Sequence, residues 1–246
     1  MYHHAESDKY SNSVGMLEKH FKFISQKYQT VFPKNYTKNF FHYELCLVFD
    51  DAYFDFYYYI FPLLKKYNIK AILSVPTNYI VDDTNLSDEI RLAYKHDEAM
   101  INSNHKKFVP FCTWKEICEM ISTGLVEVAS HGVFHQNLLI VDKETCIMEL
   151  SKSKKIIECK TGKEPTAFVY PYGKYNKDVL QLVNEYYLFN FSIGRFINLN
   201  IHNSVIYRVY ADEMSTPSNL LSFKNRMKYT LFYFLLIIFP SIRGKI

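Results

Sequence analysis

Glycine is scarce in this sequence, and its cysteines show no pairing pattern. The 246 residues include 7 glycines and 5 cysteines, and the cysteines form no CxxC pair. An odd number of scattered cysteines argues against a disulfide framework or a zinc knuckle and indicates a reducing compartment. No glycine-rich loop of the kind that binds phosphate is present, which disfavours a phosphatase built on acidic residues.

Targeting signals and strong charge are also missing. Residues 1–6 have no charged region followed by an apolar core, so no secretory signal is indicated and we expect a cytoplasmic protein. The formal charge of +4 is modest and does not argue for a nucleic-acid partner. With 48% hydrophobic residues, 22% charged residues and no internal repeat, the composition predicts one folded domain over residues 1–225.

The C-terminal tail, residues 226–246, differs from the rest of the chain. Residues 229–242 carry no charge, and basic residues flank them on both sides. This stretch is too short to cross a bilayer, for which a helix needs about 20 residues. Two alternatives remain: a buried C-terminal helix, or an interfacial anchor that gives peripheral contact with anionic membranes.

Short apolar runs alternate with amphipathic stretches along the chain. We predict strands at 45–49, 70–75, 125–130, 166–170, 188–193 and 205–210, and helices at 16–28, 54–66, 113–123, 142–159 and 177–185. The polar residues 82–107 are expected to form an insertion with one helix over the rim of the domain. Such alternation predicts an α/β fold with a parallel sheet and crossover helices, open or closed as a barrel.

Two adjacent carboxylates, Asp50 and Asp51, end the first predicted strand. Acids at the carboxyl end of a buried strand lie where α/β folds place their active sites. Because successive strand side chains point to opposite faces, the two acids have different roles unless the strand breaks there. The alternative is a helix N-cap, which Asp favours, but a cap explains only one of the two acids.

Two histidines, His131 and His135, follow the third predicted strand. A spacing of four places them on one face of a helical turn, and neutral imidazole is a common zinc ligand. Strand ends of a parallel sheet share one rim, so the acid pair and the histidine pair are expected to converge. One carboxylate and two imidazoles leave positions open for water, as in catalytic metal sites. The alternative is that each histidine is simply packed or capping.

A third motif, Tyr170-Pro171-Tyr172-Gly173, follows the fourth predicted strand. Proline fixes the backbone and glycine permits a sharp turn. Such a loop can direct a backbone N–H at a reacting oxygen. The alternative is an ordinary turn.

Taken in this order, the three motifs resemble those of the polysaccharide deacetylase family, the NodB-homology domain of carbohydrate esterase family 4. The resemblance covers about residues 43–210. It implies a distorted (β/α) barrel and a divalent metal, usually zinc, bound by Asp51, His131 and His135. It also implies that Asp50 is the catalytic base and that the backbone N–H of Tyr172 helps to bind the oxyanion.

Two positions depart from the family pattern. Val169 stands where the family often has an arginine that holds the base, and Arg208 or Arg195 are the candidates to replace it. The late Leu-x-His that supplies the family's general acid has no clean match, and His202 is the nearest histidine.

The dipeptide Tyr2-His3 resembles a Tyr-His pair that ends the first strand in many family members. The strand that normally precedes this pair would then lie upstream of Met1, or be absent. An upstream segment coding for an apolar strand would support the first alternative.

The resemblance implies a metal-dependent hydrolase that removes N-acetyl groups from an N-acetylated saccharide, in bacterial surface-polysaccharide metabolism. The metal activates water and polarises the acetamide carbonyl, and Asp50 accepts the water's proton. One alternative is a non-catalytic glycan-binding or scaffolding member of the same fold. Another is a non-haem Fe(II) oxygenase, which also uses two histidines and one carboxylate.

Overall fold

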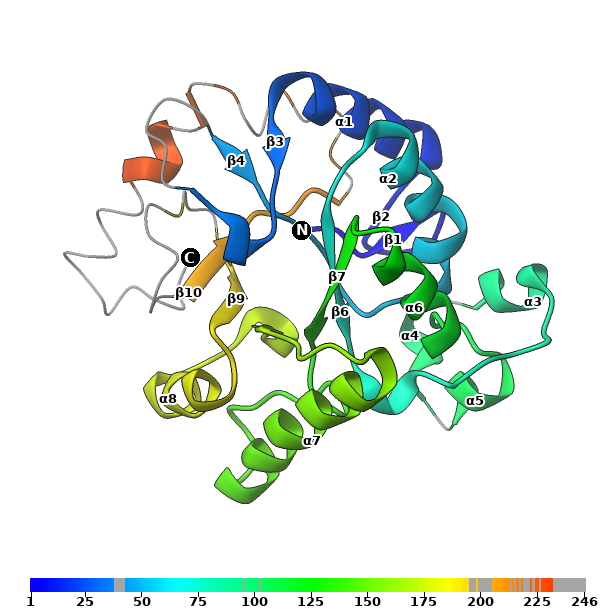
Figure 1. Cartoon of the computed structure of the whole chain (residues 1–246), viewed down its shortest axis with the longest axis vertical. Coiled ribbons are helices and arrows are strands. Elements are labelled where there is room, and N and C mark those ends of the chain that lie inside the picture. Colours follow the sequence, from blue (N-terminus) through cyan, green and yellow to red (C-terminus); the bar gives the residue numbers. More distant parts are fainter. Residues whose placement is uncertain are drawn as a thin grey trace.

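A six-stranded parallel sheet forms the centre of the molecule. The computed structural model describes residues 1–37, 43–94, 96–101, 103–194, 198, 205–212, 214, 216, 218, 222, 224–225 and 227–231. The strands lie in the order β10-β9-β8-β7-β6-β5. Their bounds are Leu47–Phe49 (β5), Ala71–Val75 (β6), Val126–Ser130 (β7), Ala167–Val169 (β8), Phe189–Ile193 (β9) and Val205–Arg208 (β10). The sheet is curled, which confirms the predicted (β/α) barrel with its six strands (Figure 1).

Crossover helices surround the sheet on its outer side (Figure 1). They are α1 (Val14–Lys27), α2 (Phe61–Tyr67), α6 (Trp114–Ser122), α7 (Lys143–Thr161) and α8 (Lys177–Tyr186). A π-helical turn, Phe56–Ile60, precedes α2, and Pro62 lies in the first turn of α2, where its missing N–H costs nothing. Four two-residue strands that the sequence did not reveal are β1 (His4–Ala5), β2 (Ser11–Asn12), β3 (Gln29–Thr30) and β4 (Glu44–Leu45).

Alternate residues of each strand face the barrel interior. One apolar cluster fills this interior and includes Val48, Ile72, Ala129, Val169 and Ile206. The residues between them point outward into two further clusters, which pack against the surrounding helices. Two residues further along their strands, the next side chains that face inward are Asp50, Ser74, His131 and Arg208. These four residues therefore lie at one end of the barrel.

The first residues of the chain bridge the two edges of the curled sheet. The Tyr2 N–H donates to the carbonyl of Val48 (2.9 Å), and the Asp50 N–H donates to the carbonyl of Tyr2 (3.0 Å). On the other side, the Ala211 N–H donates to the carbonyl of Met1 (2.9 Å). Residues 1–3 therefore take the place of a strand between β5 and β10, the two edge strands of the sheet.

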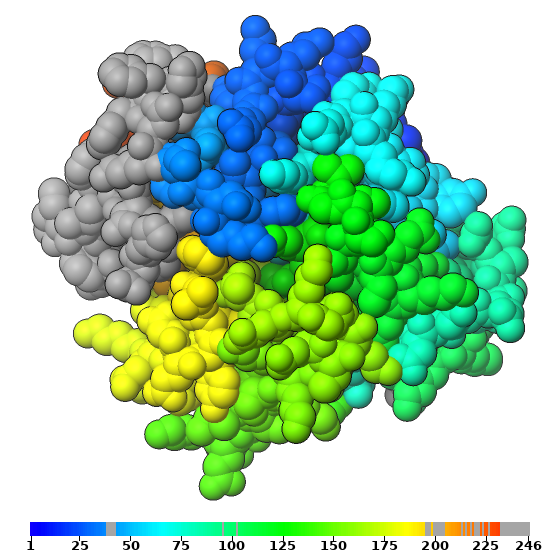
Figure 2. Space-filling view, viewed as in Figure 1, coloured from blue at the N-terminus to red at the C-terminus, as the bar shows by residue number. Residues whose placement is uncertain are grey.

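The described residues of the insertion, 82–94, 96–101 and 103–107, form three short helices rather than the single helix predicted. They are α3 (Asp88–Leu92), α4 (His96–Ala99) and α5 (Asn104–Lys107). The prediction was wrong because polar residues with irregular spacing carry no period from which turns could be separated. This segment projects from one side of the molecule (Figure 2).

A buried arginine attaches the insertion to the domain. Arg91 makes a bidentate ion pair with Glu116 (2.7 and 2.9 Å) and donates to the carbonyls of Val109 and Phe111. Its guanidinium carbon also lies 3.4 Å from the ring centre of Phe54. Glu116 in turn completes the capping box of α6, so one carboxylate serves both elements.

The predicted tail falls largely on residues 232–246, which lie outside the described residues, as do Arg195 and His202. Within the part of the chain that is described, no helix combines the length and the apolarity needed to span a membrane.

Replacing Arg91 with Met is expected to lower the free energy of unfolding by about 3–5 kcal/mol, because Glu116, whose side chain is only 15% exposed, loses the cation that compensates its charge. Urea unfolding followed by circular dichroism measures this change. The matched control is Lys115→Met, whose ion pair with Asp83 is exposed (72% and 54%) and is expected to contribute under about 1 kcal/mol. Equal effects of the two substitutions would contradict the anchoring role of Arg91.

Candidate metal centre

Strand β5 ends in a left-handed turn that separates the two acids. Asp51 and Ala52 have φ angles of 69° and 55°, a region that residues other than glycine rarely adopt. Asp50 faces the barrel interior, as Val48 of β5 does. In a regular strand Asp51 would point outward, but the left-handed turn changes the direction of its side chain. The following π-helical turn has Asp55 at its N-cap, so the alternative of a helix cap is wrong for both acids.

The two histidines lie on a loop after β7, not on the predicted helical turn. His135 has a φ of 55°, which a helical turn does not permit. His131 Nδ1 lies 2.7 Å from the carbonyl oxygen of Val169. Because a carbonyl only accepts, Nδ1 carries the proton, and the lone pair of Nε2 is left for a ligand.

A buried glutamate on α7 holds this loop. The Glu149 carboxylate accepts the N–H groups of Val133 (2.7 Å) and Phe134 (3.1 Å) and is fully buried. Gly132 has a φ of 80°, and a Cβ there would lie 2.5 Å from Glu149 Oε2. The loop therefore needs glycine at this position.

Asp51, His131 and His135 together form a site that suits a divalent metal. Asp51 Oδ1 lies 3.5 Å from His131 Nε2 and 3.4 Å from His135 Nε2. This oxygen is buried and has no hydrogen-bond partner, which is costly unless a cation binds it. Among the residues that the structure describes, this trio is the one cluster of metal-ligating side chains found.

The protonation state of His131 fits the same purpose. Burial, together with the neighbouring His135, lowers the pKa of His131 to about 4. At neutral pH the imidazole is therefore uncharged, as a metal ligand must be.

Asp50 binds different partners from Asp51. Arg208 Nη1 donates to Asp50 Oδ1 at 2.6 Å, and the Ser74 hydroxyl donates to the same oxygen at 3.0 Å. Burial opposes the ionisation of Asp50, but the charge of Arg208 and the nearby imidazoles outweigh it and hold the pKa of the carboxyl well below its usual range. Arg208, on β10, thus binds Asp50. In the family pattern, the arginine that binds this acid would stand at position 169, which is a valine here.

A second acid–histidine pair lies beside Asp50, and the sequence did not assign it. His3 Nδ1 is 2.7 Å from Asp212 Oδ2, and His3 Nε2 is 3.9 Å from Asp50 Oδ2. Burial disfavours the charged imidazolium, but the hydrogen bond to Asp212 and the charges of Asp50 and Asp51 outweigh it, so the pKa of His3 is raised. The Tyr2-His3 motif was the only signal in the sequence for this pair.

Tyr172 lies next to the metal-binding residues. Its ring centre is 4.9 Å from that of His135, and 58% of the side chain is exposed. The backbone at Tyr172 is left-handed, with a φ of 60°. The Pro-Tyr-Gly segment is thus a strained turn at the rim of the centre.

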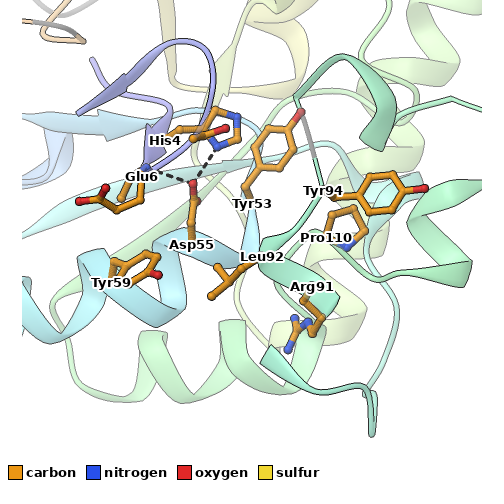
Figure 3. A pocket seen from close by; sticks show the side chains of 11 residues that line it. His4, Glu6, Tyr53, Asp55, Tyr59, Arg91, Leu92, Tyr94 and Pro110 are labelled. Atoms are coloured by element: carbon orange, nitrogen blue, oxygen red, sulfur yellow. Dashed lines mark hydrogen bonds and ion pairs between the residues drawn. The ribbon is translucent and has the colours of Figure 1, made fainter. Parts of the chain in front are cut away.

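A cavity lies beside His4, on the side of the insertion (Figure 3). His4 binds Asp55 through Nδ1 (2.7 Å) and His96 through Nε2 (3.0 Å). The ring of Tyr53 lies close to that of His4, with ring centres 4.0 Å apart and the planes tilted by 47°. These contacts connect α4 of the insertion to the residues that follow His3.

Replacing Glu149 with Gln is expected to weaken Zn²⁺ binding about 10–100-fold, because the charge that holds two backbone N–H groups is lost and an amide NH₂ would face the N–H of Phe134 and displace the histidine loop. Isothermal titration calorimetry with Zn²⁺ measures the affinity. Glu144→Gln, an exposed position on the same helix, is the control and should bind like the unmodified protein. Unchanged affinity in Glu149→Gln would show that the loop does not need this carboxylate.

Comparison with known proteins identifies the family. A family model described as polysaccharide deacetylase matches residues 42–188, more than half of the chain. YxkH of Bacillus subtilis (strain 168), which carries the same family name, is 27% identical over 192 residues, 74% of this chain and 58% of YxkH. The poly-β-1,6-N-acetyl-D-glucosamine N-deacetylase of Staphylococcus aureus (strain MRSA252) is 27% identical over 172 residues, 67% of this chain and 49% of that protein. The chain thus spans about half the length of these relatives.

The fold agrees with this result. The structure of the Streptococcus pyogenes deacetylase PplD in complex with acetate has a TM-score of 0.70 to this chain at 21% identity, and the match covers 90% of this chain and 94% of PplD. The matched residues 42–188 include Asp50, Asp51, His131, His135 and Tyr172, so the motifs lie within the matched region. The chain belongs to the polysaccharide deacetylase family.

Proposed function

We propose that this protein is a zinc-dependent N-deacetylase that removes acetyl groups from an N-acetylated glycan of the bacterial surface. The observation that carries the proposal is the convergence of three groups of different character at one end of the barrel. They are the Asp51, His131 and His135 cluster, an ionised carboxyl at Asp50, and a histidine of raised pKa at His3. Neighbouring groups whose pKa values are shifted in opposite directions are typical of acid–base catalysis.

Zinc held by Asp51, His131 and His135 would supply Lewis acidity that activates a water molecule and polarises the acetamide carbonyl. Asp50 accepts the proton of the attacking water, since its carboxyl is ionised and adjoins the ligand residue Asp51. The backbone N–H of Tyr172 donates to the oxygen that becomes negatively charged.

His3 then acts as the general acid. Its Nδ1 binds Asp212, which leaves Nε2, on the side of Asp50, to give a proton to the departing nitrogen. The C–N bond breaks, and the products are acetate and the free amine of the sugar. The proposal of a glycan substrate is supported by the name of the Staphylococcus aureus relative, which acts on poly-N-acetylglucosamine.

Replacing Asp50 with Asn is expected to reduce acetate release at least about 100-fold while Zn²⁺ still binds, because the base is lost and the ligand residues remain. The assay measures acetate released from N-acetylglucosamine oligomers by the zinc-loaded protein. Asp178→Asn, an exposed position on α8, serves as the control. If the unmodified protein binds metal and glycan but releases no acetate, a non-catalytic glycan-binding role replaces the proposal.

The pH dependence tests the role of His3. A general acid must be protonated, so activity should fall as pH rises through the pKa of His3. Asp212→Asn removes the carboxylate whose charge and charged hydrogen bond raise this pKa, and the alkaline limb of the kcat/KM profile should therefore move to lower pH. A limb at the same pH in the variant would show that His3 is not the titrating acid.

A further inference from the structure

The backbone ladder that joins the first residues of the chain to β5 stops before His3. Tyr2 pairs with Phe49 of β5, and the left-handed turn that follows this strand then leads its backbone away. A continued parallel ladder would next bond the N–H of His4 to the carbonyl of the residue after β5. This N–H donates instead to the carbonyl of Tyr10, at 3.1 Å. His3 therefore depends on contacts outside this ladder for its position.

Two carboxylates hold the segment where the ladder is missing. Asp212 accepts the backbone N–H of His3 through Oδ1 (3.0 Å) and binds its ring through Oδ2 (2.7 Å). For the next two residues, Asp55 Oδ2 accepts from His4 Nδ1 (2.7 Å) and from the N–H of Ala5 (3.0 Å) (Figure 3). Asp55 is only 7% exposed and His4 only 3%. Hydrogen bonds to a carboxylate are about twice as strong as neutral ones, so residues 3–5 are fixed at both ends.

Asp55 does not serve the helical turn that it precedes. It occupies the N-cap position of the π-helical turn Phe56–Ile60, but its side chain makes no capping hydrogen bond there. Its Oδ1 is buried and has no hydrogen-bond partner among the described residues. An unpaired buried oxygen costs about 1–3 kcal/mol, so stability alone does not explain a carboxylate at this position. The hydrogen bonds of Asp55 are instead those to residues 4 and 5.

The anchored ring of His4 and the acid His3 lie on opposite sides of the same segment. Successive side chains of an extended chain point to opposite faces. His4 points to Asp55 and, through Nε2, to His96 of the insertion (3.0 Å). His3 points to the other side, where its Nε2 is 3.9 Å from Asp50 Oδ2. Fixing His4 on the outer side therefore sets the direction of His3 on the inner side.

We propose that Asp55 is a positioning residue for the general acid. By binding His4 and Ala5 it holds residues 3–5 so that Nε2 of His3 faces the departing nitrogen. The inference depends on the proposed function, in which His3 gives the proton to that nitrogen. Asp55 acts through His3 and not on the reacting atoms. Its effect on rate is nevertheless large, because a misplacement of about 1 Å can cost about 100-fold in rate.

Two acetyl compounds with different leaving groups separate the position of the acid from general damage to the site. Cleavage of N-acetylglucosamine oligomers needs a proton on the departing nitrogen, whereas 4-nitrophenyl acetate releases 4-nitrophenolate, which leaves as an anion. In zinc-loaded Asp55→Ala protein, kcat for the oligomers should fall about 10–100-fold with KM unchanged. Hydrolysis of the ester should stay within about 3-fold of the unmodified protein. His3→Ala should show the same selective loss.

Three further variants complete the test. Asp55→Asn, whose amide oxygen can accept both hydrogen bonds, should restore most of the oligomer activity that Asp55→Ala loses. The matched control is Thr113→Ala, which removes a buried side chain that also accepts a backbone N–H, that of Glu116 at the start of α6, and should leave both reactions unchanged. If Asp55→Ala does not fold, His4→Phe, which keeps a ring and removes the hydrogen bond, takes its place with the same expected result.

Amide hydrogen exchange in the metal-free protein tests the positioning without turnover. The backbone amides of His3 and Ala5 should exchange about 10-fold or more faster in Asp55→Ala than in the unmodified protein, because the segment opens more often. The amide of Leu73, in the middle of β6, is the internal reference and should exchange at an unchanged rate. Nuclear magnetic resonance measures the three amides separately.

The outcomes distinguish this proposal from the proposed function. If His3→Ala loses only the oligomer reaction while Asp55→Ala loses both reactions equally or neither, the positioning role is overturned and the proposed function stands. Unchanged exchange of the two amides in Asp55→Ala also overturns it. If the unmodified protein hydrolyses the ester but releases no acetate from any oligomer, the proposed function fails, and the exchange rates still decide whether Asp55 holds the segment.

Discussion

The buried ion pair between Asp50 and Arg208 is the interaction on which the rest of this structure depends. Asp50 follows β5 and Arg208 lies on β10, so the pair joins the two edges of the six-stranded sheet. Both side chains are only 4% exposed. Truncation of either side chain would leave an uncompensated buried charge, at a cost of about 3–5 kcal/mol, whereas Asp50→Asn keeps an oxygen that can accept from Arg208. The same contact keeps Asp50 ionised, so one interaction both joins the edges of the sheet and maintains a buried carboxylate beside the candidate metal cluster.

The adjacent acids Asp50 and Asp51 have different surroundings, and this difference sets the properties of the centre. Arg208 and Ser74 stabilise the charge of Asp50, whereas Asp51 has a buried oxygen without a partner and is free to bind a cation. Asp212 has the opposite effect on His3, since it favours the proton on the ring. An ionised carboxyl and a histidine of raised pKa thus lie beside the candidate metal cluster, and the protonation state of each depends on a neighbouring side chain.

Local patterns were enough to predict much of the fold and part of the site. Apolar runs marked the six strands because strands that are buried on both faces are nearly continuous hydrophobic segments. The acid pair and His131 and His135 were singled out because they follow such runs, and strand ends of a parallel sheet meet at one rim. The resemblance to the family then assigned Asp51 rather than Asp50 to the metal. The helical turn expected for the histidines was wrong, because a spacing of four residues does not reveal the left-handed backbone at His135. The two-residue strands carry too few residues to show a period.

The sequence by itself determined the order of strands and helices along the chain and the placement of two acids and two histidines after strand ends, which the structure brings together in one cluster. Only the tertiary structure decided which groups surround Asp50. Arg208 is 158 positions from Asp50, and Asp212 is 209 positions from His3. No sequence period links residues so far apart; they meet because the curling of the sheet brings β10 and the first residues of the chain to the edge of β5.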